Sequence, residues 1–358
     1  MELRKYRKST INDVATAAGV SVSTVSAYVR GRRTVCSMQT ADRITRAIAE
    51  LHYSPSAAAR GSSDRSTNTI GVVTWDVLPY NTLADDLYYF RLNHGIQSVL
   101  NERDVMLLTY PSSIRKSTGY SAIIDGRVDG VLMGASITDD RPEKIARAGL
   151  PIVVLERYRA LPDGCGAACA SEADVVRLAL EHLWGLGHRR IAHLSGGVDD
   201  DPHGDCQASH LHDFAIWRRR HYIDWMRQRG AYDPRLERTG GGWSISVERA
   251  LAVLDAWLSL PEPPTAVFCA NDRIAIGLMQ AATSRRLRIP EDLSVVGVDN
   301  QPRAAAAGLT TVDVPLEAIG RAGAEALLDM MAGLPFAECR RMVGVSDLVV
   351  RQSTAPPQ

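Results

Sequence analysis

The sequence of 358 residues lacks the features that would send a chain to a membrane or an oxidising compartment. It has no run of eighteen apolar residues, so we expect no segment to span a bilayer. Its first ten residues, MELRKYRKST, carry charge but no apolar stretch, which argues against a signal peptide. Its six cysteines form no CxxC pair and are expected to be free thiols. We therefore predict a cytoplasmic protein with no membrane partner.

Motifs typical of enzymes are also missing. The sequence has no P-loop, no GxSxG, no HExxH and no GxGxxG after a predicted strand. We predict no catalysis and no cofactor. One loop, residues 199–213, holds His203, Cys206, His210 and His212, which are zinc- or nickel-compatible residue types. Their spacing fits no zinc motif, so a solvated acidic loop is the preferred interpretation and we predict no metal site.

The net charge of zero hides an uneven distribution. Residues 1–60 contain ten Lys/Arg and four Asp/Glu, a formal charge of +6, and the remainder of the chain carries −6. A basic N-terminal segment is the electrostatic pattern of a protein that binds the nucleic-acid backbone. The alternative is a solvated basic arm without a partner.

That basic segment contains a pattern typical of a helix-turn-helix, TINDVATAAGVSVSTVSAYV (Thr10–Val29). Thr10 and Asp13 form a capping box for a first helix, whose predicted apolar stripe is Val14, Ala17 and Ala18. Gly19 lies where the chain must turn, a position that favours a residue tolerant of positive φ.

The second helix of the pattern begins after Ser21, which is its predicted N-cap. Val25 and Val29 form its inner face. Val22, Ser23, Ser26 and Ala27 form its outer face. A helix presented in this way can enter the DNA major groove with its N-terminus first. The alternative is an ordinary helical hairpin.

The sequence pattern changes from helical to linker-like and then to alternating strands and helices. Ser37 caps a third predicted helix, and residues 54–68 have the small, polar composition of a linker. From Thr69 onward, β-branched runs alternate with helical patterns, which predicts parallel sheets with right-handed crossovers. The final six residues, STAPPQ, are predicted to be disordered. The predicted strands are Thr69–Trp75, Val105–Tyr110, Asp129–Gly134, Pro151–Glu156, Arg190–Ser195, Thr265–Ala270 and Leu293–Val298, and the predicted helices are Leu83–Arg103, Ala170–Leu186, Phe214–Gln228, Ser246–Leu258, Asp272–Arg285 and Leu316–Met331.

The order of these motifs resembles the LacI/GalR family of bacterial transcription regulators. The resemblance continues through HYSPSAAARG (His52–Gly61), TIGVV (Thr69–Val73), EHLWGLGHRRIAHLSGG (Glu181–Gly197), PPTAVFCANDRIAIG (Pro263–Gly277) and RIPEDLSVVGVDN (Arg288–Asn300). It covers nearly the whole chain, and several dispersed motifs in one order are a specific signal.

The resemblance implies an N-terminal all-α helix-turn-helix head and an α/β body of two Rossmann-like parallel-sheet subdomains, shaped like periplasmic binding proteins. The implied domains are a DNA-binding head (1–53), a hinge (54–68) and an effector-binding and dimerisation body (69–358). The body is expected to divide roughly into 69–168 with 299–330, and 169–298 with 331–352.

The resemblance also implies which residues contact DNA. Val22 and Ser23 match positions at base edges, and Thr24 and Ser26 match positions near phosphate. The implied DNA-contacting residues are Thr10, Ser21, Val22, Ser23, Thr24, Ser26, Ala27, Arg30, Arg32, Arg33, Tyr53, Ala58, Ala59 and Arg60.

Two departures from the family pattern bear on how DNA is read. Ala27 stands where the family usually has an arginine, and a lost bidentate contact to guanine removes about 1–3 kcal/mol of discrimination. Ser62 stands where the family's hinge has a leucine that wedges open a base step, and Gly61 precedes it. We therefore predict a weaker hinge helix and less DNA bending.

For the body, the resemblance implies a small-ligand site in the cleft between the two subdomains, at the carboxyl ends of strands. The matching positions are Trp75, Glu156, Arg218, Trp243, Asn271 and Asp299. An alternative interpretation is structural: Asn271 and Asp299 cap helices, Arg218 is a surface charge and Trp75 belongs to the core.

The function implied is a ligand-responsive, sequence-specific transcription regulator, most often a repressor in this family. Its expected partners are a near-palindromic double-stranded operator, which a homodimer binds, and a small-molecule effector, a sugar or a related polar metabolite. The rival readings are a solute-binding transport protein, which would need a signal peptide and no head, and an enzyme on the same fold.

Overall fold

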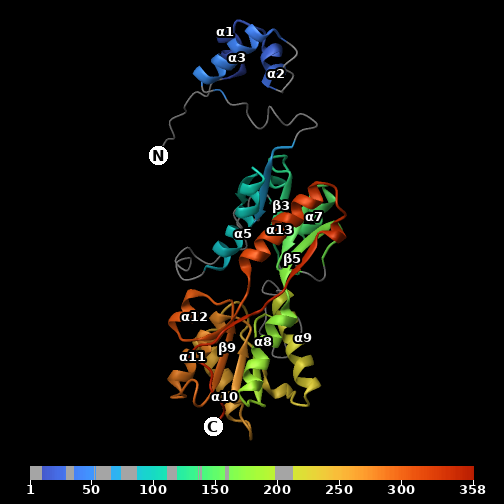
Figure 1. Cartoon of the computed structure of the whole chain (residues 1–358). Helices are drawn as coiled ribbons and strands as arrows, with labels where there is room; N and C mark the ends of the chain where they lie inside the picture. Colours follow the sequence, from blue (N-terminus) through green and yellow to red (C-terminus); the bar gives the residue numbers. More distant parts are fainter. Residues whose placement is uncertain are drawn as a thin grey trace. The chain divides into compact units, whose positions relative to one another are not determined.

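The structure is a computed structural model that describes residues 10–29, 36–51, 53, 66–73, 87–110, 119–135, 137, 139–157, 161–197 and 213–358. The chain divides into two compact units, Met1–Thr67 and Asn68–Gln358, which are described separately. Figure 1 shows the course of the chain and labels most of its elements.

The described residues of the head contain three short helices, α1 (Ile11–Ala18), α2 (Val22–Val29) and α3 (Met38–Glu50). All three contribute to one small apolar core. The buried members of that core are Val14, Ala15, Ala18, Val25, Ile44 and Ala47. Val14 and Ala18 of the predicted stripe of α1 and the inner position Val25 of α2 are buried as predicted. Ala17, the third member of the stripe, is exposed, and Val29 is only partly buried.

The body contains two six-stranded sheets. The first sheet has the order β11-β5-β4-β3-β1-β2 and is parallel throughout. Its strands are β1 (Thr69–Val73), β2 (Met106–Tyr110), β3 (Gly130–Gly134), β4 (Ile152–Leu155), β5 (Cys165–Ala170) and β11 (Arg340–Val343). Its helices are α5 (Tyr88–Glu102), η3 (Gly119–Ala122), α7 (Arg141–Arg147), α13 (Leu316–Met331) and η6 (Phe336–Glu338). Strands β1, β3, β4 and β5 are buried along their whole length, as expected of a sheet covered on both faces.

The second sheet has the order β12-β10-β9-β8-β6-β7, with only β12 antiparallel to its neighbour. Its strands are β6 (Ile191–Ser195), β7 (Glu237–Thr239), β8 (Ala266–Cys269), β9 (Ser294–Val298), β10 (Thr310–Asp313) and β12 (Asp347–Val349). Its helices are α8 (Glu172–Gly185), α9 (Asp213–Gln228), η5 (Pro234–Leu236), α10 (Val247–Leu258), α11 (Asp272–Ser284) and α12 (Pro302–Ala306).

The chain passes between the two sheets three times. It crosses between β5 and α8, between β10 and α13, and between β11 and β12. The expected division had placed 299–330 with the first subdomain and 331–352 with the second. The strand pairing instead places β10 in the second sheet and β11 in the first, because β10 pairs with β9 and β11 pairs with β5.

Helices α5 and α13 pack against each other at unusually short range, and Figure 1 shows them side by side. A Cβ atom added at Gly95 would overlap the backbone carbonyl of Glu317, and one added at Gly320 would overlap the carbonyl of Leu92. Each glycine therefore makes room for the backbone of the other helix. This close contact fixes α13, which comes from the far end of the chain, onto the first sheet.

The C-terminal tail is ordered, so the prediction of disorder from Ser353 onward was wrong. Ser353 is buried, donates to the Val295 carbonyl at 2.6 Å and accepts from the Thr310 amide at 2.8 Å. Ala355 accepts a hydrogen bond from His188 Nε2 at 2.8 Å. The small, polar composition misled the prediction because these contacts join the tail to β9 and β10, which are distant in sequence.

Within the described residues, no helix has both the length and the apolar character needed to cross a membrane.

Candidate DNA-binding surface and effector cavity

In the head, the local sequence determines where the first helix begins and ends. The Thr10 amide donates to Asp13 Oδ2 at 2.7 Å, and the Asp13 amide donates to Thr10 Oγ1 at 3.3 Å, which completes the predicted capping box. Gly19 ends the helix at φ 62°, in the left-handed region that favours glycine. The predicted turn is therefore present, and it directs the chain into α2.

Helix α2 presents its N-terminal end to solvent. Val22 is 41% exposed although it is apolar, and Ser21 and Ser23 are also exposed. Ser21 Oγ accepts from the Thr24 amide at 3.1 Å, as an N-cap does. Thr24, Ser26 and Ala27 are half-buried. The positions predicted to touch base edges thus lie on the open face of the helix.

The remaining predicted DNA contacts are not on the open face of α2. Tyr53 packs against the apolar core of the head, and its amide donates to the Ile48 carbonyl at 3.0 Å. Outside the described residues lie Arg30, Arg32, Arg33, Ala58, Ala59, Arg60 and the hinge residue Ser62.

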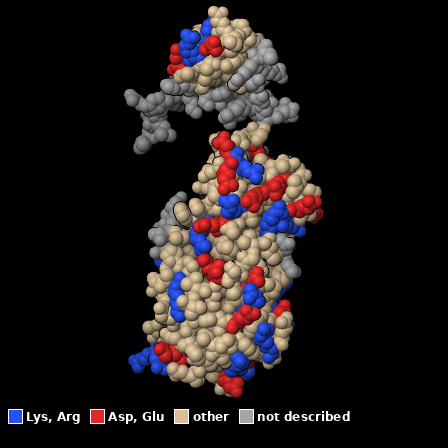
Figure 2. Space-filling model, in the orientation of Figure 1, with Lys and Arg blue, Asp and Glu red and all other residues tan. Residues whose placement is uncertain are grey.

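The described part of the head is not itself basic. Its only Lys or Arg residues are Arg43 and Arg46, beside the acidic Asp13, Asp42 and Glu50. Figure 2 shows basic side chains in blue and acidic side chains in red together on this part of the surface. The positive charge of the segment therefore comes from residues beyond those that the structure describes.

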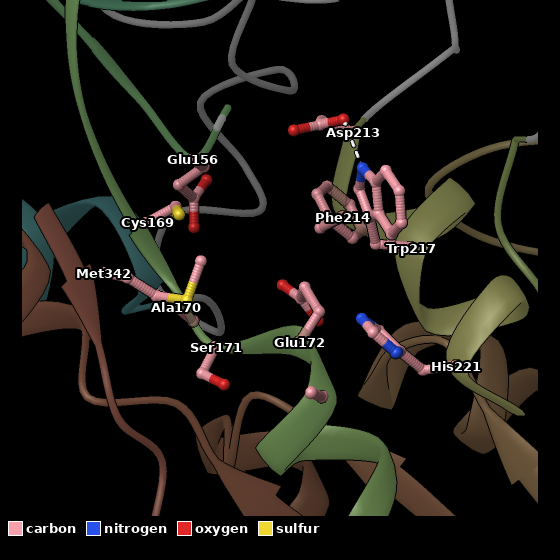
Figure 3. Close-up of a pocket in the computed structure, with 11 residues that line it drawn as sticks. Glu156, Cys169, Ala170, Ser171, Glu172, Asp213, Phe214, Trp217, His221 and Met342 are labelled. Carbon is pink, nitrogen blue, oxygen red and sulfur yellow. Dashed lines mark hydrogen bonds between the residues drawn. The ribbon is translucent and has the colours of Figure 1, made fainter. Parts of the chain in front are cut away.

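In the body, a cavity of about 200 Å³ lies where the two sheets meet (Figure 3). The first sheet contributes the residues at the ends of β4, β5 and β11, and the second subdomain contributes α8 and α9. The lining residues are Glu156, Cys169, Ala170, Ser171, Glu172, Ala173, Asp213, Phe214, Trp217, His221 and Met342.

Glu156 occupies this cavity in an unusual backbone conformation. It follows β4 with φ 57°, a region that non-glycine residues rarely adopt and that is common at ligand sites. Its Oε2 atom is buried and has no hydrogen-bond partner among the described residues. Burial raises the pKa of the carboxyl group to about 8, with Arg218 lowering it and Glu172 raising it further.

Arg218 forms a buried ion pair with Glu172, one of the lining residues. Arg218 Nε lies 2.5 Å from Glu172 Oε2, with side chains 4% and 13% exposed. Its Nη1 donates to the Ala270 carbonyl, at the end of β8. Its Cζ lies 4.8 Å from the centre of the Phe214 ring. The interpretation of Arg218 as a surface charge is therefore wrong, and the arginine joins the cavity wall to the second sheet.

Two other predicted effector contacts, Asn271 and Asp299, follow strands of the second sheet. Asn271 caps α11, because its Oδ1 accepts from the Ile274 amide at 2.8 Å while its Nδ2 donates to the Trp243 carbonyl at 3.0 Å. Asp299 follows β9 at φ 108° and is half-buried.

Trp243, one of the two aromatic residues of the predicted set, contacts a residue of the cavity wall. The Trp243 ring packs on the Phe214 ring at 5.2 Å between centroids. Of the six predicted residues only Glu156 lines the cavity, and Trp75 lies outside the described residues.

Sequence reasoning missed most of the cavity wall. Glu172, Asp213, Trp217 and His221 were not among the predicted residues. Asp213, Trp217 and His221 are four residues apart, so one face of α9 carries all three, and Trp217 Nε1 donates to Asp213 Oδ1 at 2.9 Å. That spacing, visible in the sequence, could have indicated that these three side chains share one face of a helix. The loop 199–213, for which a solvated acidic loop was preferred over a metal site, lies almost wholly outside the described residues, since 198–212 are not described.

A second polar network lies beside the cleft. Asp272 is buried at the start of α11; its Oδ1 accepts from Thr311 Oγ1 at 2.6 Å, and its Oδ2 accepts from the Gln301 amide at 2.8 Å. Gln301 Oε1 in turn accepts from the Leu87 amide at 2.9 Å, just before α5 of the other subdomain. Burial raises the pKa of Asp272 to about 7, although the bond from Thr311 opposes the shift.

Comparison with known proteins agrees with this arrangement. Residues 10–56 match the model of bacterial regulatory proteins of the lacI family, and residues 180–354 match a periplasmic binding protein-like domain. The HTH-type transcriptional repressor PurR of Vibrio atlanticus (strain LGP32) is 30% identical over 336 residues, which cover 90% of this chain and 91% of the relative. The chain belongs to the LacI family.

Solved structures of LacI-family regulators have the same fold. The Lac repressor dimer bound to operator and the anti-inducer ONPF is similar with a TM-score of 0.74 and 25% identity, covering 98% of this chain and all of that one. The complex of the transcriptional regulator CelR with cellobiose has a TM-score of 0.67 and 26% identity, covering 96% and 99%. The expected family, fold and class of function are thereby confirmed: the LacI-family chain is a DNA-binding transcription regulator with an α/β ligand-binding body.

Proposed function

We propose that this LacI-family regulator is a repressor that binds a near-palindromic operator as a homodimer. The observation that carries the proposal is the exposed N-terminal end of α2, with Val22 and Ser23 open to solvent on a head that precedes a two-sheet body. Two heads related by a two-fold axis would contact two half-sites in inverted order. The similarity to a Lac repressor dimer bound to operator supports the dimer.

For base reading, we propose that Val22 contacts a thymine methyl group and that Ser23 hydrogen-bonds to a base edge. Thr24 and Ser26 are proposed to lie near phosphates. Ala27 offers no guanidinium for a guanine, so direct readout should be weaker than in relatives with arginine there. Arginines of the loop after α2 are proposed to hold phosphates, which adds affinity without sequence preference.

We propose that a small polar effector binds between the two subdomains and shifts the affinity for DNA, with a sugar as the family's usual class. Support comes from the cavity, which is lined by both subdomains, and from the similarity to a regulator crystallised with cellobiose. Closure around a ligand would move the subdomains relative to each other. A coupling of about 1–3 kcal/mol between effector and operator is typical of such proteins.

The relatives are regulators rather than enzymes, and we propose that this chain likewise has no catalytic activity and acts in the cytoplasm, where its DNA is. Turnover of a substrate by the purified protein would contradict that part of the proposal.

Footprinting on the DNA upstream of the protein's own gene tests the proposal, at 50 mM and 200 mM salt. We expect a protected near-palindrome at both concentrations. Weak binding that grows with DNA length and vanishes at the higher salt would show backbone binding alone, and would contradict sequence-specific repression.

A further inference from the structure

In the part of the cavity wall that the structure describes, acidic side chains predominate. Charged side chains from several elements act electrostatically on Glu156 and on its neighbours Arg157, Cys169 and Arg218. They are the carboxyl groups of Asp139, Glu156, Glu172, Asp213 and Asp299 and the guanidinium groups of Arg157 and Arg218, with His221 at the cavity wall. Among the described residues, three carboxyl groups, those of Glu156, Glu172 and Asp213, line the cavity itself, and no lysine or arginine does. Without a cation beside it, a buried carboxyl group is favoured in its neutral form, and a cation bound there would favour the ionised form.

The described part of the cavity wall has more hydrogen-bond acceptors than donors. Three carboxyl groups lie there with the Ser171 hydroxyl, the His221 ring and the Trp217 indole N–H, which is bonded to Asp213. Arg218, behind the wall, has its donors engaged, since its Nε and Nη2 are bonded to Glu172 and its Nη1 is bonded to the Ala270 carbonyl. The buried Oε2 of Glu156, in contrast, accepts no hydrogen bond from the described residues. A ligand that complements this wall must donate hydrogen bonds.

Aromatic rings form the opposite wall. Figure 3 shows Phe214 and Trp217 across the cavity from Glu156, with the carboxyl group of Glu172 pointing into the space between them. The rings already attract cations within the protein, since Arg218 lies over Phe214 and the Arg220 Cζ lies 5.0 Å from the Trp217 ring centre. Carboxylates opposite aromatic rings are a favourable surrounding for an ammonium group.

We propose that this cavity binds its effector through a protonated amine, which forms an ion pair with Glu156 and lies beside the rings of Phe214 and Trp217. The inference rests on the proposed function, because it names the chemistry of the effector. The ligand is small, since the cavity of about 200 Å³ is below the roughly 300–1,000 Å³ of pockets for drug-sized molecules.

The test compares amines with hydroxyl compounds of matched shape by isothermal titration calorimetry on the full-length protein at pH 7. The pairs are D-glucosamine with D-glucose, putrescine with 1,4-butanediol, and ethanolamine with ethylene glycol. We expect at least one amine to bind at least about tenfold more tightly than its partner, a difference of about 1.4 kcal/mol. Equal affinity within every pair, or no binding by any amine, would overturn the proposal.

Variants locate the binding. Glu156→Gln keeps the size of the side chain and removes its charge, so amine affinity should fall at least about tenfold while the thermal melting curve stays cooperative. Glu291→Gln, at an exposed position of the second subdomain, is the matched control and should bind the amine as the unmodified protein does. Amine affinity that survives Glu156→Gln would contradict the role of Glu156.

Proton release gives an independent readout. With the pKa of Glu156 at about 8, the carboxyl group is largely protonated at pH 7, and pairing with an ammonium group would ionise it. Amine binding should therefore release close to one proton, measured as different apparent enthalpies in phosphate and HEPES buffers. Glu156→Gln should abolish that difference. Amine binding without proton release would contradict the ion pair.

The regulator proposal is judged separately by operator footprinting of the same sample. A protected operator that responds to a neutral sugar, together with no preference for amines, would overturn the amine inference and leave the regulator proposal standing. Absence of a protected operator would contradict the regulator proposal whatever the ligand experiments show.

Discussion

Arg218 connects more of the body than any other single side chain described above. It pairs with Glu172 at the start of α8, bonds to the end of β8 and packs over Phe214. A guanidinium suits this position because its planar fork donates in several directions at once. The residue therefore holds the cavity wall in place as well as contributing charge.

We predict that Arg218→Met lowers the free energy of unfolding by about 3–5 kcal/mol, because it leaves Glu172 buried without its cation. Adding Glu172→Gln should restore most of the loss. Urea titration measures both effects, and Arg220→Met, at an exposed position on the same helix, is the control. A double variant no more stable than Arg218→Met would contradict the ion-pair explanation.

A pH dependence follows from Asp272. Its pKa is raised to about 7 in the folded protein, against about 3.9 in an unfolded chain. The folded state thus binds the proton more tightly, so this residue's contribution to stability is greatest below about pH 4, declines as the pH rises and is constant above about pH 7.

We predict that Asp272→Asn removes this decline. The free energy of unfolding of the unmodified protein, minus that of the variant, should fall by at most about 1.4 kcal/mol per pH unit between pH 4 and 7. An asparagine can keep both bonds, accepting from Gln301 and donating to the Thr311 hydroxyl. Denaturant titrations across this range measure the difference, and a constant value would show that Asp272 titrates as in an unfolded chain.

At the scale of elements, the close packing of α5 against α13 holds the first subdomain together. We predict that Gly320→Ala destabilises the protein by more than 3 kcal/mol, since the new Cβ meets the backbone of α5 rather than a movable side chain. Gly185→Ala is the matched control in α8, where a Cβ meets no atom within 4 Å. That substitution should be neutral or stabilise by up to about 1 kcal/mol. Thermal melting measures both, and equal effects would contradict the close packing.

The sequence predicted the elements whose pattern is local. Runs such as IGVV and SVVGV gave β1 and β9, and the capping box gave the start of α1. It did not predict β5, whose CGAACA has no β-branched residue and which is a strand because β4 and β11 flank it. Strands β7, β10, β11 and β12 and helices α7 and α12 were also missed, since all are short.

The cavity wall could be predicted only in part, because some of its residues are brought together by contacts between elements that are distant in sequence. Glu156 matched a family position, so it was found. Glu172 and Arg218 are 46 residues apart, and only the packing of α8 against α9 brings them together. For Asn271, the alternative interpretation, that it caps a helix and does not contact a ligand, describes the hydrogen bond that the structure shows.

At the scale of the whole molecule, DNA binding depends on the head and on the hinge that follows it. The sequence predicts a weak hinge helix, because Gly61 and Ser62 replace a helix-favouring, wedge-forming pattern. We predict only a slight DNA bend in a circular-permutation gel, and a larger bend with tighter operator binding for Ser62→Leu. Ser63→Leu is the neighbouring control. A strong, centred bend by the unmodified protein would contradict this prediction.

The three crossings between the sheets also constrain how such a gene can change. Neither half of the body is encoded by one continuous stretch, since β11 and α13 complete the first sheet and β12 and the tail complete the second. A premature stop codon before residue 340 would therefore leave both halves unfinished. Recombination could exchange one intact ligand-binding half between related genes only by exchanging several separate segments together, so new specificities should arise mainly through point substitutions in the cavity wall.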